Sequence, residues 1–245
     1  MDPKGKVVLI TGGAVRIGRA IALVLSKAGC RLLIHYRHSE KNAKELKKKI
    51  ERRYKNTVVL LQADLNSLEG VKALTDQATS QGKRVDILIN NAAEFYRTPI
   101  GKISEKNWDQ LLSVNLKAPF FLSQWLGRQM VRNKAGKIIN IADISAFRPW
   151  KDYLPYSISK AGLVTLTQGL AKAFAPYVQV NAVAPGTILA PVTGWNAQQR
   201  RQTLDLIPLR RMGSPQDIAR TVLFLIENDY MTGTVIPIDG GRQIV

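Results

Sequence analysis

Tyr156 and Lys160 are the two residues whose types and spacing point most directly to chemistry. They stand four positions apart at the start of an expected helix, so both side chains lie on one helix face. A free phenol has a pKa near ~10 and transfers a proton poorly at neutral pH, but an adjacent ammonium stabilises the phenolate and lowers that pKa. The pair predicts an acid–base tyrosine assisted by a lysine. An isolated Tyr-x-x-x-Lys match is also common by chance and purely structural, so the surrounding motifs decide.

A glycine-rich turn near the N-terminus is the second chemical signal. It reads Thr11-Gly12-Gly13-Ala14-Val15-Arg16-Ile17-Gly18, after a short apolar strand and before an amphipathic helix. Glycines let the backbone approach a pyrophosphate, and the following helix N-terminus presents unpaired N–H groups and a positive dipole end. In this position the turn predicts a dinucleotide site.

The end of the second strand distinguishes the two nicotinamide cofactors. NAD enzymes usually carry an Asp or Glu there for the ribose 2′-hydroxyl. Here His35-Tyr36 is followed by Arg37, His38 and Ser39, with no acid before Glu40. A carboxylate would repel a 2′-phosphate, whereas Arg37, His38 and the Ser39 hydroxyl would bind it. We therefore predict NADP(H), against the alternative that a basic strand end merely continues into a basic helix.

Strands and helices that would position these groups alternate along the whole chain. Expected strands are 7–10, 32–36, 58–62, 87–90, 137–142, 178–183 and 235–238; expected helices are 17–25, 41–55, 68–79, 105–131, 153 to before Pro176, and 218–226. Apolar strands alternating with helices are typical of a parallel sheet covered on both faces, and right-handed crossovers make it doubly wound. We predict one α/β domain over 1–245. The long stretch at about 186–209 is expected to be a substrate loop.

Composition limits the partners and the compartment. The 36 Lys+Arg against 18 Asp+Glu give a formal charge of +18, which keeps nucleic acid among the candidate partners. Much of the excess lies in 41–55, where a solvated helix face with a Glu45–Lys49 pair is expected. No apolar run reaches the ~18 residues of a membrane span, and no signal-peptide core is present. Cys30 is the only cysteine, which suits a reducing cytoplasm and, with two His, excludes a metal cluster.

Several motifs follow one another in a fixed order. They are Thr11-Gly12 with Gly18, Asn90-Asn91-Ala92, Asn115, Tyr156-x-x-x-Lys160 and Pro185-Gly186. Together they resemble the short-chain dehydrogenase/reductase family over essentially the whole chain. The resemblance implies a seven-stranded Rossmann-type sheet, a homotetramer or dimer, and a catalytic set of Asp143, Tyr156, Lys160 and Asn115. It implies that Lys160 also binds the nicotinamide ribose and that Asn115 holds a water linking Lys160 to solvent. Cofactor contacts are expected from Gly12, Arg16, Ile17, Gly18, Tyr36, Arg37, His38, Ser39, Asp64, Leu65, Asn91, Ala92, Ala93, Tyr156, Lys160, Pro185, Gly186 and Ile188.

Three departures from the common family pattern narrow the resemblance. Arg16 replaces a glycine, Ala93 stands where glycine is usual, and Asp143 stands thirteen residues before Tyr156, at the usual place of a serine. These features are similar to pteridine reductases and the related bacterial dihydromonapterin/dihydrofolate reductases. That resemblance implies a Phe95 ring stacked on a pterin. The residues expected to contact substrate are Phe95, Arg16, Asp143, Tyr156 and Trp195.

Asp143 carries the choice of reaction. A serine hydroxyl can donate a hydrogen bond to a carbonyl oxygen, but a carboxylate cannot, and it would repel a developing alkoxide. Reduction of a C=N bond instead needs a proton at the ring nitrogen, which a carboxyl group beside Tyr156 can relay if burial raises its pKa. The alternative is that Asp143 only caps a turn and Ser145 takes the serine's part.

The resulting prediction is an NADPH-dependent reductase of a C=N bond in a small pterin or dihydrofolate-type substrate. One alternative is a generic carbonyl reductase for a 3-oxoacyl group or a sugar ketone. Another is a non-catalytic NADP-binding or nucleic-acid-binding protein. The complete set of Asn115, Tyr156 and Lys160 argues against lost catalysis, and no nucleic-acid-reading motif is visible.

Overall fold

The computed structural model describes residues 1–80, 84–190 and 194–245, and its centre is one parallel sheet. The strands are β1 (Val7–Ile10), β2 (Arg31–Tyr36), β3 (Val58–Gln62), β4 (Ile87–Asn90), β5 (Gly136–Ile141), β6 (Val178–Pro185) and β7 (Val235–Ile238). Their order is β3-β2-β1-β4-β5-β6-β7, with every neighbouring pair parallel. The seven strands and the Rossmann-type sheet are therefore as predicted.

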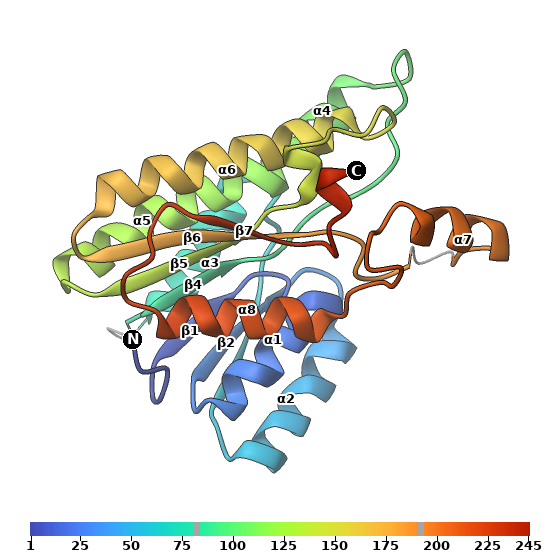
Figure 1. Ribbon diagram of the computed structural model, residues 1–245. Helices are drawn as coiled ribbons and strands as arrows, with labels where there is room; N and C mark the ends of the chain where they lie inside the picture. Colours follow the sequence, from blue (N-terminus) through green and yellow to red (C-terminus); the bar gives the residue numbers. More distant parts are fainter. Residues whose placement is uncertain (81–83, 191–193) are drawn as a thin grey trace.

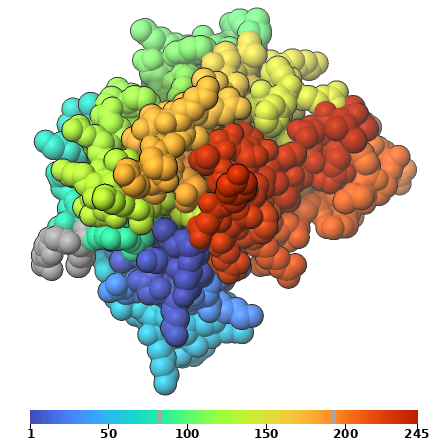
Figure 2. All heavy atoms as spheres, turned by 60° about the vertical axis from the view of Figure 1, so that its left-hand side comes forward, coloured from blue at the N-terminus to red at the C-terminus, as the bar shows by residue number. Residues whose placement is uncertain are grey.

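Helices cover both faces of the sheet (Figure 1). The elements are α1 (Arg16–Lys27), α2 (Glu40–Tyr54), α3 (Leu68–Thr79), α4 (Glu105–Leu112), α5 (Ala118–Arg132), α6 (Leu154–Phe174), α7 (Ala197–Asp205) and α8 (Pro215–Glu227). Helices α1, α2 and α8 bury their apolar stripes on one face, and α3, α5 and α6 on the other. The blue N-terminal part of the chain therefore lies against its red C-terminal part in Figure 2.

The sheet changes direction of winding between β1 and β4. The chain runs outward from β1 through β2 to β3, then returns to β4 and continues to β7. Ligands of doubly wound sheets bind at the carboxyl ends of the strands where this reversal occurs. The glycine-rich turn after β1 and the Asn90–Asn91 segment at the end of β4 meet at that point, so the fold alone indicates where a cofactor would lie.

Two predicted elements differ from the structure. The helix expected over 105–131 is interrupted by a π-helical turn (Ser113–Lys117) that includes Asn115. Such turns are short local changes of the hydrogen-bond pattern within an α-helix, and the apolar spacing along 105–131 did not predict this one. The expected loop at about 186–209 contains α7, capped by Asn196 with Gln199. Because α7 buries none of its residues, it has no apolar stripe to identify it. Positions 191–193 of that loop lie outside the described residues.

Among the described residues, no helix combines the length and the apolar character needed to cross a membrane.

Candidate active site

The end of β5 and the start of α6 bring Asp143, Tyr156 and Lys160 together. The Tyr156 hydroxyl donates to Asp143 Oδ2 at 2.9 Å, and the Lys160 Nζ lies 5.7 Å from the centre of the Tyr156 ring. Lys160 donates to the backbone carbonyl of Ile141 at 2.8 Å. Both Tyr156 and Lys160 are buried. Within the predicted pair, Tyr156 therefore hydrogen-bonds to Asp143 and not to Ser145.

Asp143 has two partners, one for each carboxylate oxygen. Its Oδ1 accepts the backbone N–H of Ser145 at 2.7 Å, which caps the short helical turn Ile144–Ala146. Its Oδ2 accepts from Tyr156. The capping role considered from the sequence is thus present together with the contact to Tyr156. Burial raises the pKa of Asp143 above its ordinary value, as the C=N hypothesis requires.

The pKa of Tyr156 differs from the sequence-based expectation. Lys160 was expected to lower it, but the pKa of Tyr156 lies well above its ordinary value, because burial disfavours the phenolate and the Asp143 charge adds to that effect. Burial also lowers the pKa of Lys160 to about 8. Since Lys160 bonds a backbone carbonyl and not the phenol oxygen, it stabilises the phenolate too little to compensate. Tyr156 consequently holds its proton at neutral pH, although the raised pKa also makes it a weaker acid than a free tyrosine.

Asn115 fixes the segment that follows β4. Its Nδ2 donates to the Glu94 carbonyl at 3.0 Å and to Ser159 Oγ at 3.1 Å, and its Oδ1 accepts the Glu94 N–H at 2.9 Å. The π-helical turn thus ties the Asn90–Phe95 segment to α6. The proposed water link from Asn115 to Lys160 remains a prediction.

Phe95 lies in a cluster of aromatic rings beside Tyr156. It is stacked on Tyr153 with ring centres 4.8 Å apart and an interplanar angle of 5°. It forms T-shaped pairs with Tyr156 and Trp150, with ring centres 4.8 and 6.2 Å apart. Phe95 is 51% exposed, so part of its surface is free to contact a ligand. Tyr153, which the sequence analysis missed, occupies one stacking position. Among the described aromatic contacts, Trp150 belongs to this cluster and Trp195 does not.

Apart from Tyr156 and Lys160 on α6, the predicted cofactor residues lie at the carboxyl ends of five strands. These are β1 (Gly12, Arg16, Ile17, Gly18), β2 (Tyr36, Arg37, His38, Ser39), β3 (Asp64, Leu65), β4 (Asn91, Ala92, Ala93) and β6 (Pro185, Gly186, Ile188). Leu65 and Ile188 are buried in the core. Gly186 permits a close approach, because a Cβ there would lie 2.6 Å from the Cβ of Asp239.

The phosphate loop is anchored on both sides. Thr11 Oγ1 accepts the N–H groups of Asn91 and Ala92 at 2.9 and 3.0 Å. On the other side, His35 Nδ1 accepts the Gly12 N–H at 3.1 Å, and His35 Nε2 lies 3.1 Å from the Ala63 carbonyl. Burial lowers the pKa of His35 to about 4, so the ring is neutral, with Nε2 as its donor. The sequence analysis identified His35 only as part of a motif.

The start of α1 fits a pyrophosphate. Val15 precedes the helix without a side-chain cap, and the first turn carries no acid, so its N–H groups lack the partners that usually satisfy them. Arg16, at φ 50°, adopts the left-handed conformation that favours glycine. Its exposed side chain therefore lies beside the phosphate loop, at a position where glycine is usual in the family.

Arg37, predicted to bind the 2′-phosphate, lies beside two carboxylates that the sequence did not place there. Its Nη1 donates to Glu94 Oε1 at 3.1 Å, and its Nε lies 3.3 Å from Asp64 Oδ1. The carboxyl ends of β3 and β4 bring these two acids to the end of β2, which the order of residues in the chain does not show. His38 is exposed, and Ser39 precedes α2 without capping it. A 2′-phosphate would therefore share Arg37 with two carboxylates.

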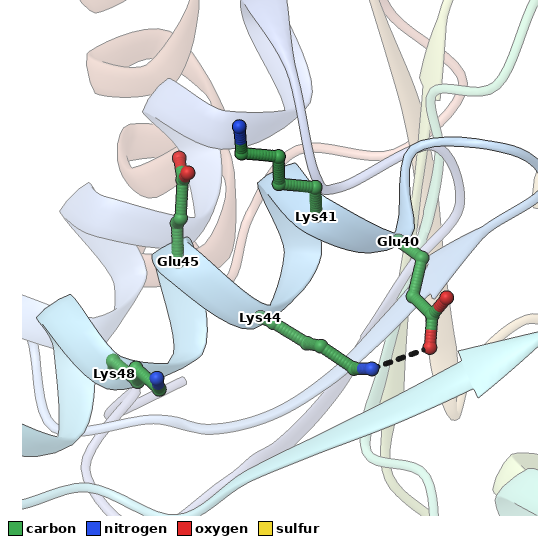
Figure 3. Close-up of a pocket in the computed structure, with 5 residues that line it drawn as sticks. All are labelled: Glu40, Lys41, Lys44, Glu45 and Lys48. Atoms are coloured by element: carbon green, nitrogen blue, oxygen red, sulfur yellow. Dashed lines mark ion pairs between the residues drawn. The ribbon is translucent and has the colours of Figure 1, made fainter.

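The basic helix α2 carries a separate hollow of about 320 Å³ lined by Glu40, Lys41, Lys44, Glu45 and Lys48 (Figure 3). Lys44 pairs with Glu40 at 2.7 Å, and Lys47 pairs with Glu51 at 3.7 Å. These pairs replace the predicted Glu45–Lys49 pair, which is not formed among the described residues. Because both acidic and basic side chains line this hollow, it has the character of a solvated helix face, as expected.

Comparisons with known proteins show which proteins this chain is similar to. A family described as enoyl-(acyl carrier protein) reductase matches residues 13–243. The 2-dehydro-3-deoxy-D-gluconate 5-dehydrogenase of Dickeya dadantii is 36% identical, over 97% of this chain and 95% of that protein. The 3-oxoacyl-[acyl-carrier-protein] reductase of Aquifex aeolicus is 36% identical over 97% of both.

A solved structure assigned to an NAD(P)-dependent gluconate 5-dehydrogenase of Beutenbergia cavernae, with NADP bound at low occupancy, superposes with a TM-score of 0.92. It is 31% identical and covers 99% of this chain and 98% of its own. These names describe a sugar-acid dehydrogenase, a 3-oxoacyl reductase and a gluconate dehydrogenase. None is a pteridine reductase, so these relatives do not support the finer resemblance predicted from Arg16, Ala93 and Asp143.

Proposed function

This chain belongs to the short-chain dehydrogenase/reductase family, and from that premise we propose that its site reduces a C=N bond of a pterin or dihydrofolate-type substrate. The chain is an NADP-dependent oxidoreductase with a seven-stranded Rossmann-type sheet. The substrate class is our inference.

One observation carries the choice of substrate. Asp143 occupies the usual place of the serine, and its Oδ2 accepts a hydrogen bond from the Tyr156 hydroxyl at 2.9 Å. While Asp143 is ionised, a ketone oxygen that approached Tyr156 would face a carboxylate, which cannot donate and which opposes negative charge on that oxygen. A ring nitrogen that gains a proton develops no such charge. The raised pKa of Asp143 lets this group hold a proton and pass it towards Tyr156.

The residues each have a task when the cofactor is bound. Reduced NADP supplies the hydride. The uncapped start of α1 would hold the pyrophosphate, and Lys160 would bind the nicotinamide ribose. Tyr156 gives its proton to the substrate nitrogen, and Asp143 then gives a proton back to Tyr156. Phe95, with an exposed ring surface, would position a planar heteroaromatic ring by stacking and help to exclude water.

Reduction of a ketone is the second candidate, and the names of the relatives favour it. The Dickeya dadantii and Aquifex aeolicus proteins, each 36% identical to this chain, are named for a sugar-acid dehydrogenase and a 3-oxoacyl reductase. Under this hypothesis Tyr156 would turn from Asp143 to the substrate oxygen, and a protonated Asp143 would serve as the donor that serine otherwise supplies.

A screen of NADPH oxidation separates the two candidates. Dihydrobiopterin and dihydrofolate are compared with 2-dehydro-3-deoxy-D-gluconate and a 3-oxoacyl thioester at equal concentrations. We expect turnover of the pterins, and we expect Asp143→Ser to depress that turnover while ketone activity rises. If only the ketones are reduced, the C=N assignment is wrong while the cofactor assignment stands.

Cofactor choice is tested with Arg37→Gln. Loss of a charge-assisted contact of about 1.5–3 kcal/mol should weaken NADPH binding about 10- to 100-fold and leave NADH binding unchanged. Lys44→Gln, which removes a cation paired with Glu40 on α2, is the matched control and should leave both affinities unchanged. Equal loss for NADPH and NADH would show that Arg37 does not contact the 2′-phosphate.

A further inference from the structure

The chain end returns to the site after β7. Gly240 and Gly241 adopt φ values of 67° and 86°, and the Asp239 carboxylate accepts the N–H groups of Gly241 and Gln243 at 2.9 and 2.8 Å. This tight turn leads into a short helical turn, Arg242–Ile244. Figure 1 shows the C-terminus beside the start of α6. The turn therefore brings Arg242 to the segment that carries Trp150 and Tyr156.

Arg242 lies against Trp150, a member of the aromatic cluster that also contains Phe95, Tyr153 and Tyr156. Its guanidinium carbon is 5.5 Å from the centre of the Trp150 ring, which forms a T-shaped pair with Phe95. Its Nη1 donates to Thr187 Oγ1, and Thr187 follows the Pro185-Gly186 motif at the end of β6. A guanidinium has five N–H donors, and Thr187 accounts for one of them. Among the described residues the guanidinium donates no other hydrogen bond, so most of its hydrogen-bonding capacity remains available beside Trp150.

The charge on Arg242 has no close counter-ion. Within the described ranges Arg242 forms no ion pair. Asp143 and Asp239 attract it from a greater distance, and Arg148 repels it. Burial lowers its pKa, which reflects the cost of holding a cation away from water. An anionic group placed on this guanidinium would offset that cost.

We propose that Arg242 is a specificity-determining residue that binds a carboxylate of the substrate. The planar donor fork on an aromatic ring matches a carboxylate in two parallel hydrogen bonds. The proposal rests on the proposed function and deepens it: the preferred substrate is a pterin that carries a carboxylate side chain, as folates do, over one with an uncharged side chain.

Binding to the NADP⁺-saturated enzyme tests this without turnover. Folate, with a carboxylate-bearing tail, and biopterin, with an uncharged one, are titrated calorimetrically into wild type, Arg242→Gln and Arg242→Lys. We expect Arg242→Gln to weaken folate binding about 10-fold or more and to change biopterin binding less than about 3-fold. Arg242→Lys should restore part of the loss, and added salt should weaken folate binding only where the cation is present.

If Arg242→Gln lost affinity for folate and biopterin equally, Arg242 would have a packing role alone and the proposal would be overturned. No loss of affinity for either ligand would overturn it as well. If neither pterin binds wild type, the C=N assignment fails separately. The comparison is then made with 2-dehydro-3-deoxy-D-gluconate against hydroxyacetone, an uncharged ketone. A carboxylate ligand bound equally by wild type and Arg242→Gln would overturn the proposal there too. Thermal unfolding of each variant verifies that it is folded.

Discussion

The hydrogen bond between Tyr156 and Asp143 determines which proton is available for chemistry. Burial keeps the phenol protonated and raises the pKa of both groups. A tyrosine in this condition has a proton to give and is held in position, but its raised pKa makes it a weak acid, so transfer needs a substrate atom that becomes basic as the hydride arrives. Lys160, which bonds the Ile141 carbonyl, contributes charge at short range and no direct bond to the phenol.

Tyr156→Phe should lower single-turnover hydride transfer by about 10²–10⁴-fold, the usual effect of losing a general acid. NADPH affinity, measured by fluorescence, should change less than about 2-fold. Tyr153→Phe is the control, because its ring also stacks on Phe95 while its hydroxyl forms no described hydrogen bond. Near-normal turnover of Tyr156→Phe would mean that the acid lies elsewhere.

Asp143→Asn should change how stability depends on pH. Because the folded-state pKa of Asp143 is raised, the stability it contributes is complete below the ordinary pKa and is lost as pH rises through the raised one. At pH 8 the Asn variant should therefore unfold at a higher temperature than wild type, with the difference vanishing in acid. Each unit of pKa shift corresponds to about 1.4 kcal/mol. Thermal unfolding across pH 4–9 measures this difference, with Asp152→Asn as a control. A wild type that is as stable as Asp143→Asn at pH 8 would contradict the prediction.

At the scale of elements, the site depends on contacts between the ends of strands. His35 on β2 accepts the Gly12 N–H after β1 and contacts the Ala63 carbonyl after β3. It thereby holds the phosphate loop against the neighbouring strand ends. The π-helical turn at Asn115 does the same for the segment after β4.

Replacing His35 should loosen the phosphate loop. His35→Leu leaves the Gly12 N–H without its partner, which costs about 1–3 kcal/mol, and should weaken NADPH binding. His35→Asn keeps an acceptor and should recover part of both losses. The pKa of about 4 lies below the ordinary 6.5, so the stability from neutral His35 is complete above 6.5 and is lost as pH falls through 4. Wild type should therefore lose more stability than His35→Asn over that interval. Identical acid curves for the two proteins would argue against this role.

At the scale of the whole molecule, an apolar groove of about 420 Å³ lies between α5 and α6. Its lining includes Leu116, Phe120, Gly162 and Leu166, and Phe120 is 40% exposed. Exposed apolar patches of this kind mark interaction sites. We propose that a second copy of the chain covers it, in the homotetramer or dimer expected for the family.

Phe120→Glu places a charge in that groove and should shift the protein to a smaller species in light scattering, because a desolvated carboxylate opposes association. Tyr230→Glu, at a fully exposed position that is not among the residues lining the groove, should leave the assembly unchanged. If both variants keep the wild-type mass, the groove is not the interface.

Sheet architecture, helix pattern, glycine-rich turn and Tyr156–Lys160 pair were predictable from the sequence, because each depends on residues close together in the chain. Apolar runs define buried strands, and a spacing of four residues places two side chains on one helix face. A site at the carboxyl ends of the strands follows from the doubly wound class, whereas the strand order itself is shown by the structure.

Contacts between distant segments were decided only by the tertiary structure. Asp64 and Glu94 reach Arg37 because three strand ends converge, and Tyr153 stacks on Phe95 because the segment before α6 lies beside the segment after β4. The raised pKa of Tyr156 arises from burial and from Asp143, neither of which the Tyr-x-x-x-Lys spacing contains. Arg242 enters the site from the chain end after a glycine turn. Electrostatics and stacking act through space, so residue order alone determined which groups were available, and packing determined which of them meet.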